Sequence, residues 1–485
     1  MPDLDSESLY KALLAKDTRF DGRFFVGVAT TGVYCRPVCR ARKPLAVNCS
    51  FYATAAEAEQ AGFRPCLLCR PELAPGYAPV DSSASLARAA ARYIERNCGV
   101  QGSLTDIARH LGCSNRHLRR VFEDAYHVRP VEYRQTCRLL LAKSLLTDTD
   151  LSVVDVAYSA GFGSLRRFNE VFRRRYRLTP TALRSQARSN RADGDTVQLS
   201  LGYRPPYRWD LMLKFLARRA IPGVEKVEDD RYTRTIRLRS SGRDLTGWVA
   251  VGNDSEHNRL AVTVSASLLP ALPVVLDGIK NLFDLHCEPD TVARALTSMD
   301  DSTLGSFIPG TRVPGCFDAF ETAVLAVLGQ QVTVQAARTL AGRLVQALGS
   351  PVDTGIDGLT TTFPMAQELL NLDGAIEQHL GPLGIIAARA RAIHGLAAMM
   401  SSGIIDASCC PDPEAAVTRF MEIPGIGAWT ANYIAMRCLA WPDAFLATDP
   451  HLPVGYVTIR HAGGPLRGRV ALIDWIYSPT ETDFS

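Results

Sequence analysis

The chain has 485 residues, a formal net charge of +4 and 47% apolar residues, which is the composition of a globular protein with more than one domain. No apolar run approaches the roughly 18 residues that a membrane span needs, and the first residues lack the pattern of a secretory signal peptide, so the composition argues against membrane and secreted proteins. Thirteen cysteines in such a chain favour reduced thiols and metal ligands over a disulfide framework, and we expect a cytoplasmic protein.

The charge is distributed unevenly along the chain. Residues 1–190 contain 29 Lys/Arg and 18 Asp/Glu, a net charge of +11, whereas residues 191–485 contain 25 and 32, a net charge of −7. One expected helix and its end carry a cluster of arginines: Arg166, Arg167, Arg173, Arg174, Arg175 and Arg177. The amino-terminal part therefore has the electrostatic pattern of a nucleic-acid-binding protein, with a simple solvated basic face as the alternative.

Two pairs of cysteines form the first motif that carries chemistry. Three residues separate Cys35 from Cys39 in TGVYCRPVCRARK, two separate Cys66 from Cys69 in RPCLLCRP, and 26 lie between the pairs. A loop of this length brings four sulfurs around one ion, and four cysteine ligands favour tetrahedral zinc. The spacing alone equally fits a structural zinc cluster that stabilises a small basic domain.

These residues, together with NCSFYATAAEAEQAGFRPCLLCRP, resemble the amino-terminal domain of the Ada family of alkylation-response proteins. The resemblance implies that Cys35, Cys39, Cys66 and Cys69 hold one zinc ion, and that Cys35 irreversibly accepts a methyl group from a DNA methylphosphotriester. Zinc keeps the thiolate, the nucleophilic form of cysteine, populated at neutral pH. Methylation removes one negative charge near DNA, so repair and transcriptional signalling are expected to be one event.

A Pro- and Ser-containing junction, Leu73 to Ser83, precedes two helix-turn-helix patterns. Leu104–Phe122 breaks at Gly112 and restarts at Ser114, and Asp155–Phe172 breaks at Gly161–Gly163 and restarts at Ser164. With the expected helix Pro130–Leu146 between them and RRRYRLTPTALR after them, they resemble the AraC family of transcription activators.

The AraC resemblance implies that the second helix of each unit enters a DNA major groove. It nominates these DNA-contacting residues: Asn115, Arg116, Arg119 and Arg120 in the first unit, and Ser164, Arg166, Arg167 and Asn169 in the second. A helical bundle that does not bind DNA is the alternative.

A polar linker, Ser189–Asp195, leads into a region whose period-2 alternation predicts strands around an amphipathic helix, Asp210–Arg219. The expected strands are Val197–Leu201, Thr235–Leu238, Trp248–Val251 and Leu260–Val264. From Asn281 onward the pattern predicts helices only, notably Ala319–Leu328, Val334–Leu348, Ile385–Met400 and Pro413–Met421.

The second chemical motif is IPGIGAWTANYIAMRCL at Ile423–Leu439, followed by DAFLATDPHL. Helix, Pro-Gly-Ile-Gly and helix form a helix-hairpin-helix, in which Gly425 and Gly427 allow a tight turn that presents backbone amides to a DNA phosphate. By itself, such a turn is an ordinary connection between helices.

The run from YRPPYRWDLMLKFLARRA through LFDLHCEP and PGCFDAFETAVLAVLGQQV to this hairpin resembles the AlkA family of alkylbase DNA glycosylases, from Leu199 to about Asp449. The resemblance makes Asp449 the catalytic carboxylate, which would stabilise an oxocarbenium-like sugar after a cationic base such as 3-methyladenine leaves. Trp429 and Tyr433 would stack on the flipped base, with a role as core aromatics as the alternative. Trp429 stands where strand-cutting relatives carry a lysine, which favours a monofunctional glycosylase.

Two further features follow from the AlkA resemblance. Backbone carbonyls of Met421, Ile423 and Ile426 would hold a monovalent cation. Gln331 occupies the position of the apolar wedge that fills the vacated base stack, although its side chain is polar.

The tail after Asp449 matches the AlkA family poorly. Pro450 and Pro453 disfavour the expected helix, and Trp475 is its one tryptophan. A diverged lid and a tail altered by a change of reading frame both fit, and we expect slow base excision.

The sequence thus predicts a multidomain, mainly α protein with α+β parts, an Ada/AlkA fusion that repairs alkylated DNA and regulates transcription. The expected domains are a zinc methyl-acceptor domain (1–80), an all-α double helix-turn-helix domain (81–190), a small α+β domain (195–280) and an all-α helix-hairpin-helix glycosylase domain (281–485). The expected partners are double-stranded DNA, both alkylated and promoter DNA, and RNA polymerase, in association with the nucleoid. A non-enzymatic regulator with structural zinc and an inactive glycosylase half is the alternative.

Overall fold

The computed structural model describes most of the chain up to residue 446. The described residues are 6–16, 24–37, 39–52, 58, 61–66, 69, 79–99, 103–126, 128–176, 178–186, 195–240, 242–287, 289, 292–293, 308–407, 409–441, 444 and 446. They fall into two compact units, residues 1–90 with 108–129, and residues 91–107 with 130–485. The domain boundaries expected near residues 80, 190 and 280 stay a prediction.

The first unit begins with a small sheet and one helix. Its sheet has the order β3-β1-β2-β4, with β1 (Phe25–Val28), β2 (Val33–Cys35), β3 (Cys49–Tyr52) and β4 (Arg64–Pro65). The helix α1 (Ser6–Ala15) buries Leu9 and Leu13 against Phe24 and Val26. This apolar core is small, so the domain depends on further stabilisation, as small domains usually do.

Both predicted helix-turn-helix patterns are confirmed. The helices are α3 (Pro79–Arg96), α4 (Leu104–His110), α5 (Asn115–Tyr126), α6 (Pro130–Asp148), α7 (Val153–Ser159), α8 (Leu165–Tyr176) and α9 (Pro180–Gln186). Gly112 and Gly161 adopt φ values of 65° and 81° in the two turns, where a Cβ atom is disfavoured. The hydroxyls of Ser114 and Ser164 accept backbone N–H bonds from His117 and Arg167, as N-caps do.

The junction expected at Leu73–Ser83 is wrong in its second half, because α3 already begins at Pro79. Proline suits the first turn of a helix, where its missing N–H costs no hydrogen bond, so it marks a start here and not a break. The first part of that junction, and most of the linker at Ser189–Asp195, lie outside the described residues.

The predicted strands are confirmed as part of a five-stranded antiparallel sheet of order β5-β9-β8-β7-β6. Its strands are β5 (Thr196–Gly202), β6 (Glu225–Glu228), β7 (Arg231–Ser240), β8 (Arg243–Asp254) and β9 (Arg259–Ser265). The sequence analysis missed β6, whose charged sequence EKVE lacks an apolar alternation. The predicted amphipathic helix is α10 (Trp209–Arg219), which buries Met212 and Phe215.

Helices follow the sheet, as predicted. They are α11 (Leu272–Leu282), α13 (Ala319–Leu328), α14 (Val334–Leu348), α15 (Ala366–Leu370), α16 (Ile376–Leu380), α17 (Ala387–Ser401), α18 (Pro413–Met421) and α19 (Ala428–Cys438). The expectation that strands end before Asn281 is wrong in one place, where β10 (Ser350–Pro351) pairs with β11 (Thr361–Thr362) across a loop. None of the helices that the structure describes is long and apolar enough to cross a membrane.

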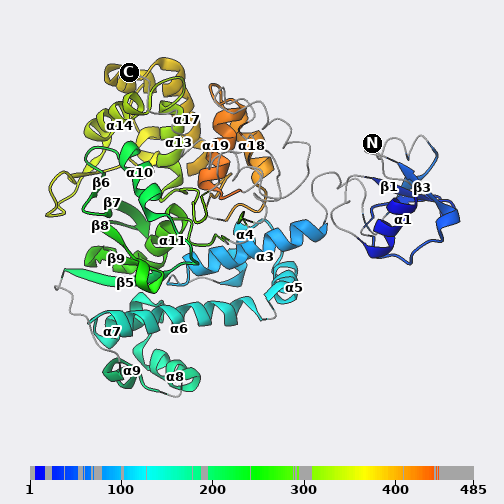
Figure 1. The fold of residues 1–485 in the computed structure, drawn as a ribbon, viewed down its shortest axis with the longest axis horizontal. Helices are drawn as coiled ribbons and strands as arrows, with labels where there is room; N and C mark the ends of the chain where they lie inside the picture. The colour runs from blue at the N-terminus through cyan, green and yellow to red at the C-terminus, as the bar shows by residue number, and fades with distance from the viewer. Residues whose placement is uncertain are drawn as a thin grey trace. The chain divides into compact units, whose positions relative to one another are not determined.

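One continuous apolar core runs through the second unit. It includes Leu145 and Phe168 of the helix-turn-helix region, Val262 of the sheet, and Ala323 and Ile434 of the later helices. Figure 1 shows α6 beside β5, at the edge of the five-stranded sheet. Helices α6 and α7 therefore pack on the α+β layer and are not joined to it by a linker alone.

A buried ion pair connects the sheet to α13. Nη2 of Arg234 on β7 lies 2.6 Å from Oε2 of Glu321 on α13, and their side chains are only 4% and 5% exposed. Burial raises the pKa of Glu321 to about 7 although Arg234 acts in the opposite direction. Removing one partner of such a pair leaves an uncompensated buried charge.

We therefore expect Arg234→Met to lower the free energy of unfolding by about 3–5 kcal/mol. The folded state favours neutral Glu321, so the contribution of Glu321 to stability falls as pH rises from about 4.5 to 7. Without Arg234 the pKa of Glu321 is higher, so this fall continues to higher pH. Urea denaturation followed by tryptophan fluorescence measures this loss, since all five tryptophans lie at or after Trp209. The double variant Arg234→Met/Glu321→Leu should recover part of the stability; an equal loss at pH 6 and pH 8 would contradict the prediction.

Candidate metal centre and DNA-repair site

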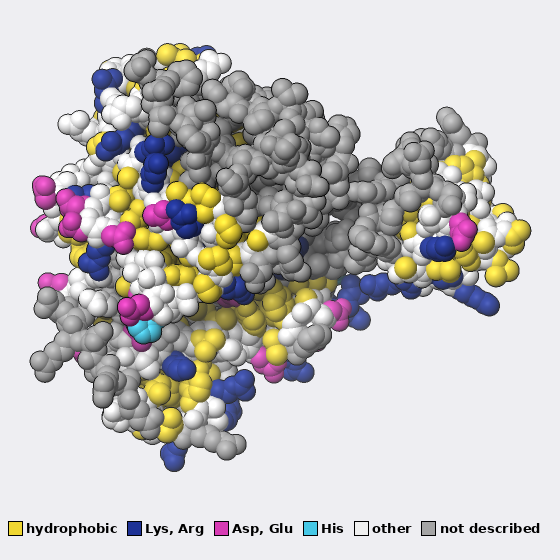
Figure 2. Space-filling view, in the orientation of Figure 1, with side chains coloured by type: hydrophobic (Ala, Val, Ile, Leu, Met, Phe, Trp, Pro, Cys, Tyr) yellow, Lys and Arg dark blue, Asp and Glu magenta, His cyan; other side chains and the backbone are white. Residues whose placement is uncertain are grey.

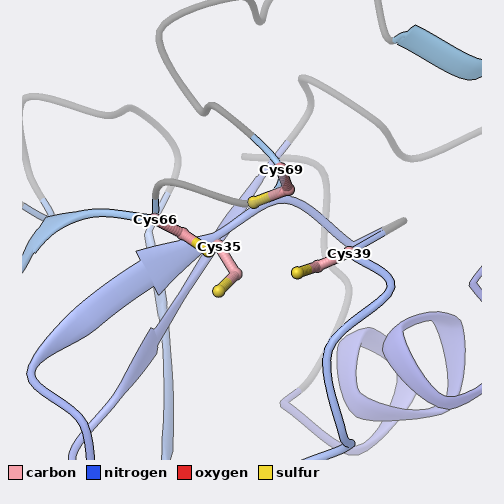
Figure 3. Close-up of side chains that lie close together, drawn as sticks. All are labelled: Cys35, Cys39, Cys66 and Cys69. Carbon is pink, nitrogen blue, oxygen red and sulfur yellow. The ribbon is translucent and has the colours of Figure 1, made fainter.

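Strand pairing brings the two cysteine pairs together. Strand β2 ends at Cys35 and pairs in parallel with β4, which puts Tyr34 opposite Pro65 and leaves Cys35 and Cys66 at neighbouring strand ends. Cys39 follows Cys35 through a turn in which its N–H donates to the Arg36 carbonyl. Figure 3 shows the side chains of all four cysteines converging.

The four sulfur atoms fit a tetrahedral ion. All of them lie within 4.8 Å of one another, and each cysteine is at most 9% exposed. Zinc–sulfur bonds of about 2.3 Å place tetrahedral sulfurs about 3.8 Å apart, so a small adjustment completes the site. The predicted ligand set of Cys35, Cys39, Cys66 and Cys69 is therefore one cluster in space.

The four adjacent sulfurs are stabilised in their ionised form by a bound cation. A hydrogen bond to Cys39 raises the pKa of Cys35, and the same hydrogen bond lowers the pKa of Cys39 to about 2, because adjacent buried sulfurs cannot all ionise. A divalent ion removes this competition and keeps all four sulfurs ionised.

Backbone donors distinguish the sulfurs. The N–H of Arg36 donates to Cys69 Sγ at 3.4 Å, and the backbone at Ala41 hydrogen-bonds Cys39. Among the described residues, neither Cys35 Sγ nor Cys66 Sγ accepts a hydrogen bond from a backbone N–H, so these donors separate Cys39 and Cys69 from the other two sulfurs. A sulfur that accepts fewer hydrogen bonds keeps more of its electron density for attack on a carbon.

Arg36 lies beside the cluster and was not predicted there. Its side chain is fully buried, and its Nη1 donates to the Cys69 carbonyl at 3.3 Å. The buried guanidinium is thus held at the backbone of Cys69, the last cysteine of the cluster. The signal was present in the sequence, because Arg36 directly follows Cys35, but nothing in the spacing predicted that an arginine would be buried.

The eight nominated DNA-contacting residues of the helix-turn-helix units all occupy exposed positions of their own helices. The opposite face of each helix carries buried side chains: Leu118 and Phe122 on α5, and Phe168 and Phe172 on α8. Ser164 also acts as the N-cap of α8, and Arg167 forms an ion pair with Glu170 at 3.3 Å. Figure 2 shows Lys and Arg side chains over the region of α8, whose last turn adds Arg173, Arg174 and Arg175.

The helix-hairpin-helix forms between α18 and α19. Gly425 adopts φ 93°, and a Cβ atom there would lie 3.4 Å from the Cβ of Ala392 on α17. The turn is closed by a hydrogen bond from Ile426 N–H to the Ile423 carbonyl at 3.0 Å, and Gly427 caps α19. A left-handed glycine packed against a neighbouring helix fixes the direction in which the hairpin amides point.

Trp429 and Tyr433 stack on each other. Their ring centroids are 5.1 Å apart and their planes differ by 10°, which leaves no space for a base between them. Tyr433 is buried, and its hydroxyl accepts from Arg437 Nη1 at 2.6 Å, whereas Trp429 is half-buried. Arg437 also donates to the Gly315 carbonyl at 2.7 Å, so it connects Tyr433 of the stacked pair to the backbone at Gly315.

Several nominated residues lie elsewhere. Gln331 is exposed in the loop between α13 and α14, with φ 53°. Asp449 lies outside the described residues, as do Arg177, Pro450, Pro453 and Trp475.

Comparison with known proteins assigns the three parts of the chain. Family models match for the metal binding domain of Ada over residues 8–72, a helix-turn-helix domain over residues 107–186 and the AlkA N-terminal domain over residues 198–318. A probable bifunctional transcriptional activator/DNA repair enzyme AlkA of Mycobacterium tuberculosis is 38% identical over 92% of this chain and 88% of that protein. The chain belongs to this family of bifunctional transcriptional activator/DNA repair enzymes.

Other relatives match parts of the chain. DNA-3-methyladenine glycosylase 2 of Escherichia coli is 38% identical over 52% of this chain and 84% of that protein. The bifunctional transcriptional activator/DNA repair enzyme Ada of Escherichia coli is 36% identical over 33% of this chain and 43% of that protein. Accordingly, this Ada/AlkA-type protein binds zinc through its cysteine cluster and binds DNA.

We expect Cys66→Ala and Cys69→Ala to lose zinc and with it the fold of the small amino-terminal sheet, because β4 has two residues and ends at the cluster. Metal analysis should fall from about one zinc per chain towards none. Limited proteolysis should then cut within residues 24–66, while tryptophan fluorescence stays unchanged. Full zinc content in both variants would contradict the assignment.

Proposed function

We propose that this Ada/AlkA-type protein removes methyl groups from DNA phosphotriesters with Cys35 and alkylated bases with its carboxyl-terminal half, and that the first reaction controls its activity as a transcription factor. The convergence of four cysteines at the ends of β2 and β4 carries the first part of this proposal. The hairpin beside the Trp429–Tyr433 pair carries the second.

Cys35 is the proposed methyl acceptor. Its sulfur attacks the methyl carbon of the triester, an S–C bond forms, the C–O bond breaks, and the phosphate oxygen leaves with the electron pair as an ordinary phosphodiester. Zinc, when bound, keeps the cysteines deprotonated at neutral pH. The N–H donors at Cys39 and Cys69 disfavour those two sulfurs as nucleophiles, and the resemblance to the Ada family favours Cys35 over Cys66.

Methylation also supplies the proposed signal. The Cys35 thiolate becomes a neutral thioether, so the cluster loses one negative charge, and its repulsion from DNA phosphates weakens. The exposed residues of the two recognition helices would then hold promoter DNA: Asn115, Arg116, Arg119, Arg120, Ser164, Arg166, Arg167 and Asn169. RNA polymerase is the proposed partner at such a promoter, in a cytoplasmic, nucleoid-associated protein.

Cys35→Ala should accept no methyl group and should keep most of its zinc, because residue 35 stays paired with Val26 of β1 and the sheet that presents the other three cysteines stays in place. Mass spectrometry of the protein after incubation with methylated DNA measures the adduct on each cysteine-containing peptide. Cys49→Ala is the matched control, since Cys49 lies in the same sheet but outside the cluster. A methyl group found on Cys39, Cys66 or Cys69 of the wild type would overturn the assignment.

The carboxyl-terminal half is the proposed monofunctional glycosylase for cationic bases such as 3-methyladenine. Gly425 and Gly427 would present hairpin amides to a phosphate, and carbonyls of Met421, Ile423 and Ile426 would hold a monovalent cation. Since Trp429 and Tyr433 stack on each other, the base would stack on the Trp429 side of the pair, with Tyr433 as its support. Gln331 would occupy the space that the base leaves.

Asp449 is the proposed catalytic carboxylate, so Asp449→Asn should slow the release of 3-methyladenine by at least about a hundredfold at unchanged affinity for DNA. Single-turnover release of the free base measures this. Asp443→Asn, six residues earlier in the sequence, is the control for a general effect of charge. Identical rates for wild type and Asp449→Asn would remove Asp449 from the mechanism.

A further inference from the structure

The loop between α13 and α14 contains two adjacent glutamines with different surroundings. The side chain of Gln330 donates through Nε2 to the Gly425 carbonyl and to Thr430 Oγ1, both at 3.0 Å. Its backbone carbonyl accepts a hydrogen bond from Nη2 of Arg389 on α17. Gln331, the next residue, is exposed.

Both side-chain acceptors belong to the hairpin. Gly425 is the left-handed glycine of the turn, and Thr430, which is 3% exposed, lies in the first turn of α19. Since 95 residues separate Gln330 from Gly425, the contact joins two segments that are distant in sequence. Gln330 is therefore held to α17 through its backbone and to the hairpin through its side chain.

Gln331 needs such support. Its φ of 53° lies in the left-handed region, which costs a residue other than glycine about 1–2 kcal/mol. A strained conformation of this kind persists only where the surrounding structure fixes it. The bonds of Gln330 fix the backbone immediately before it.

We propose that Gln330 is a positioning residue that fixes the loop carrying Gln331 to the hairpin, so that both contact one DNA molecule at a set separation. This inference rests on the proposed glycosylase function, in which the hairpin binds a phosphate and Gln331 enters the base stack. Gln330 contributes to DNA binding and not to the bond-breaking step. Its contacts hold the loop in place before DNA binds, so less conformational entropy is lost on binding. It therefore affects recognition of distorted DNA more than the rate of the bound complex.

The test uses the full-length protein and two duplexes that differ only by one tetrahydrofuran abasic residue. The helix-turn-helix units do not distinguish the two duplexes, so their contribution to binding cancels in the ratio of the two affinities. Gln330→Ala should lower this ratio by about tenfold, which is the usual loss for two hydrogen bonds. Gln330→Glu should do the same at nearly unchanged side-chain volume, because a carboxylate cannot donate to the Gly425 carbonyl.

Gln335→Ala, a change at the exposed second residue of α14, is the matched control and should leave the ratio unchanged. If Gln330 acts through the placement of Gln331, the effects of Gln330→Ala and Gln331→Ala are not additive, which a general loss of stability would not produce. Saturated single-turnover base release should change less than the affinity.

Unchanged ratios in both Gln330 variants, additive effects, or a wild type that does not prefer abasic DNA would overturn the proposal. A wild type that prefers abasic DNA in a Gln330-dependent way but releases no base from alkylated DNA would end the glycosylase function and leave the role of Gln330 standing.

Discussion

The amino-terminal part of the protein depends on four sulfur atoms held within 4.8 Å of one another. Strand β2 ends at Cys35 and strand β4 ends at Pro65, directly before Cys66, and their apolar neighbours are too few to hold them without the ion. The ion that stabilises this fold is also the one that keeps a thiolate available at neutral pH. In the proposed function, folding and chemistry thus use the same interaction, and the negative charge of the buried Cys35 thiolate would repel DNA phosphates until methylation removes it.

The second unit is held together differently. Its apolar core runs from α6 through the five-stranded sheet into α13 and α19, and the Arg234–Glu321 pair connects sheet and helices inside it. The proposed base-binding pair is supported from this core, because Arg437 joins Tyr433 to the Gly315 carbonyl.

Local sequence signals predicted much of this structure. Period-3.6 patterns, serine caps and the glycines at 112 and 161 located both helix-turn-helix units, since these are interactions within one or two turns. The cysteine spacing likewise identified the whole ligand set. The charged strand β6 was missed because its partner β7, and not its own sequence, makes it a strand.

Tertiary contacts were beyond the reach of the sequence. Nothing local predicted that Arg36 would be buried beside Cys69 or that Gln330 would bond to a hairpin 95 residues away. Each of these depends on segments that only the folded chain brings together. Family resemblance nominated residues by position, and the structure adds the contacts through which they would act.

In the proposed function, one chain carries both a stoichiometric and a catalytic repair reaction. Incubating a small amount of the purified protein with excess methyl-labelled DNA, and following label on protein and release of free bases separately, tests it most directly. We expect the protein-bound label to stop at about one methyl group per chain, while free 3-methyladenine continues to accumulate well beyond one molecule per chain. No label on the protein, or base release that stops at one per chain, would contradict it.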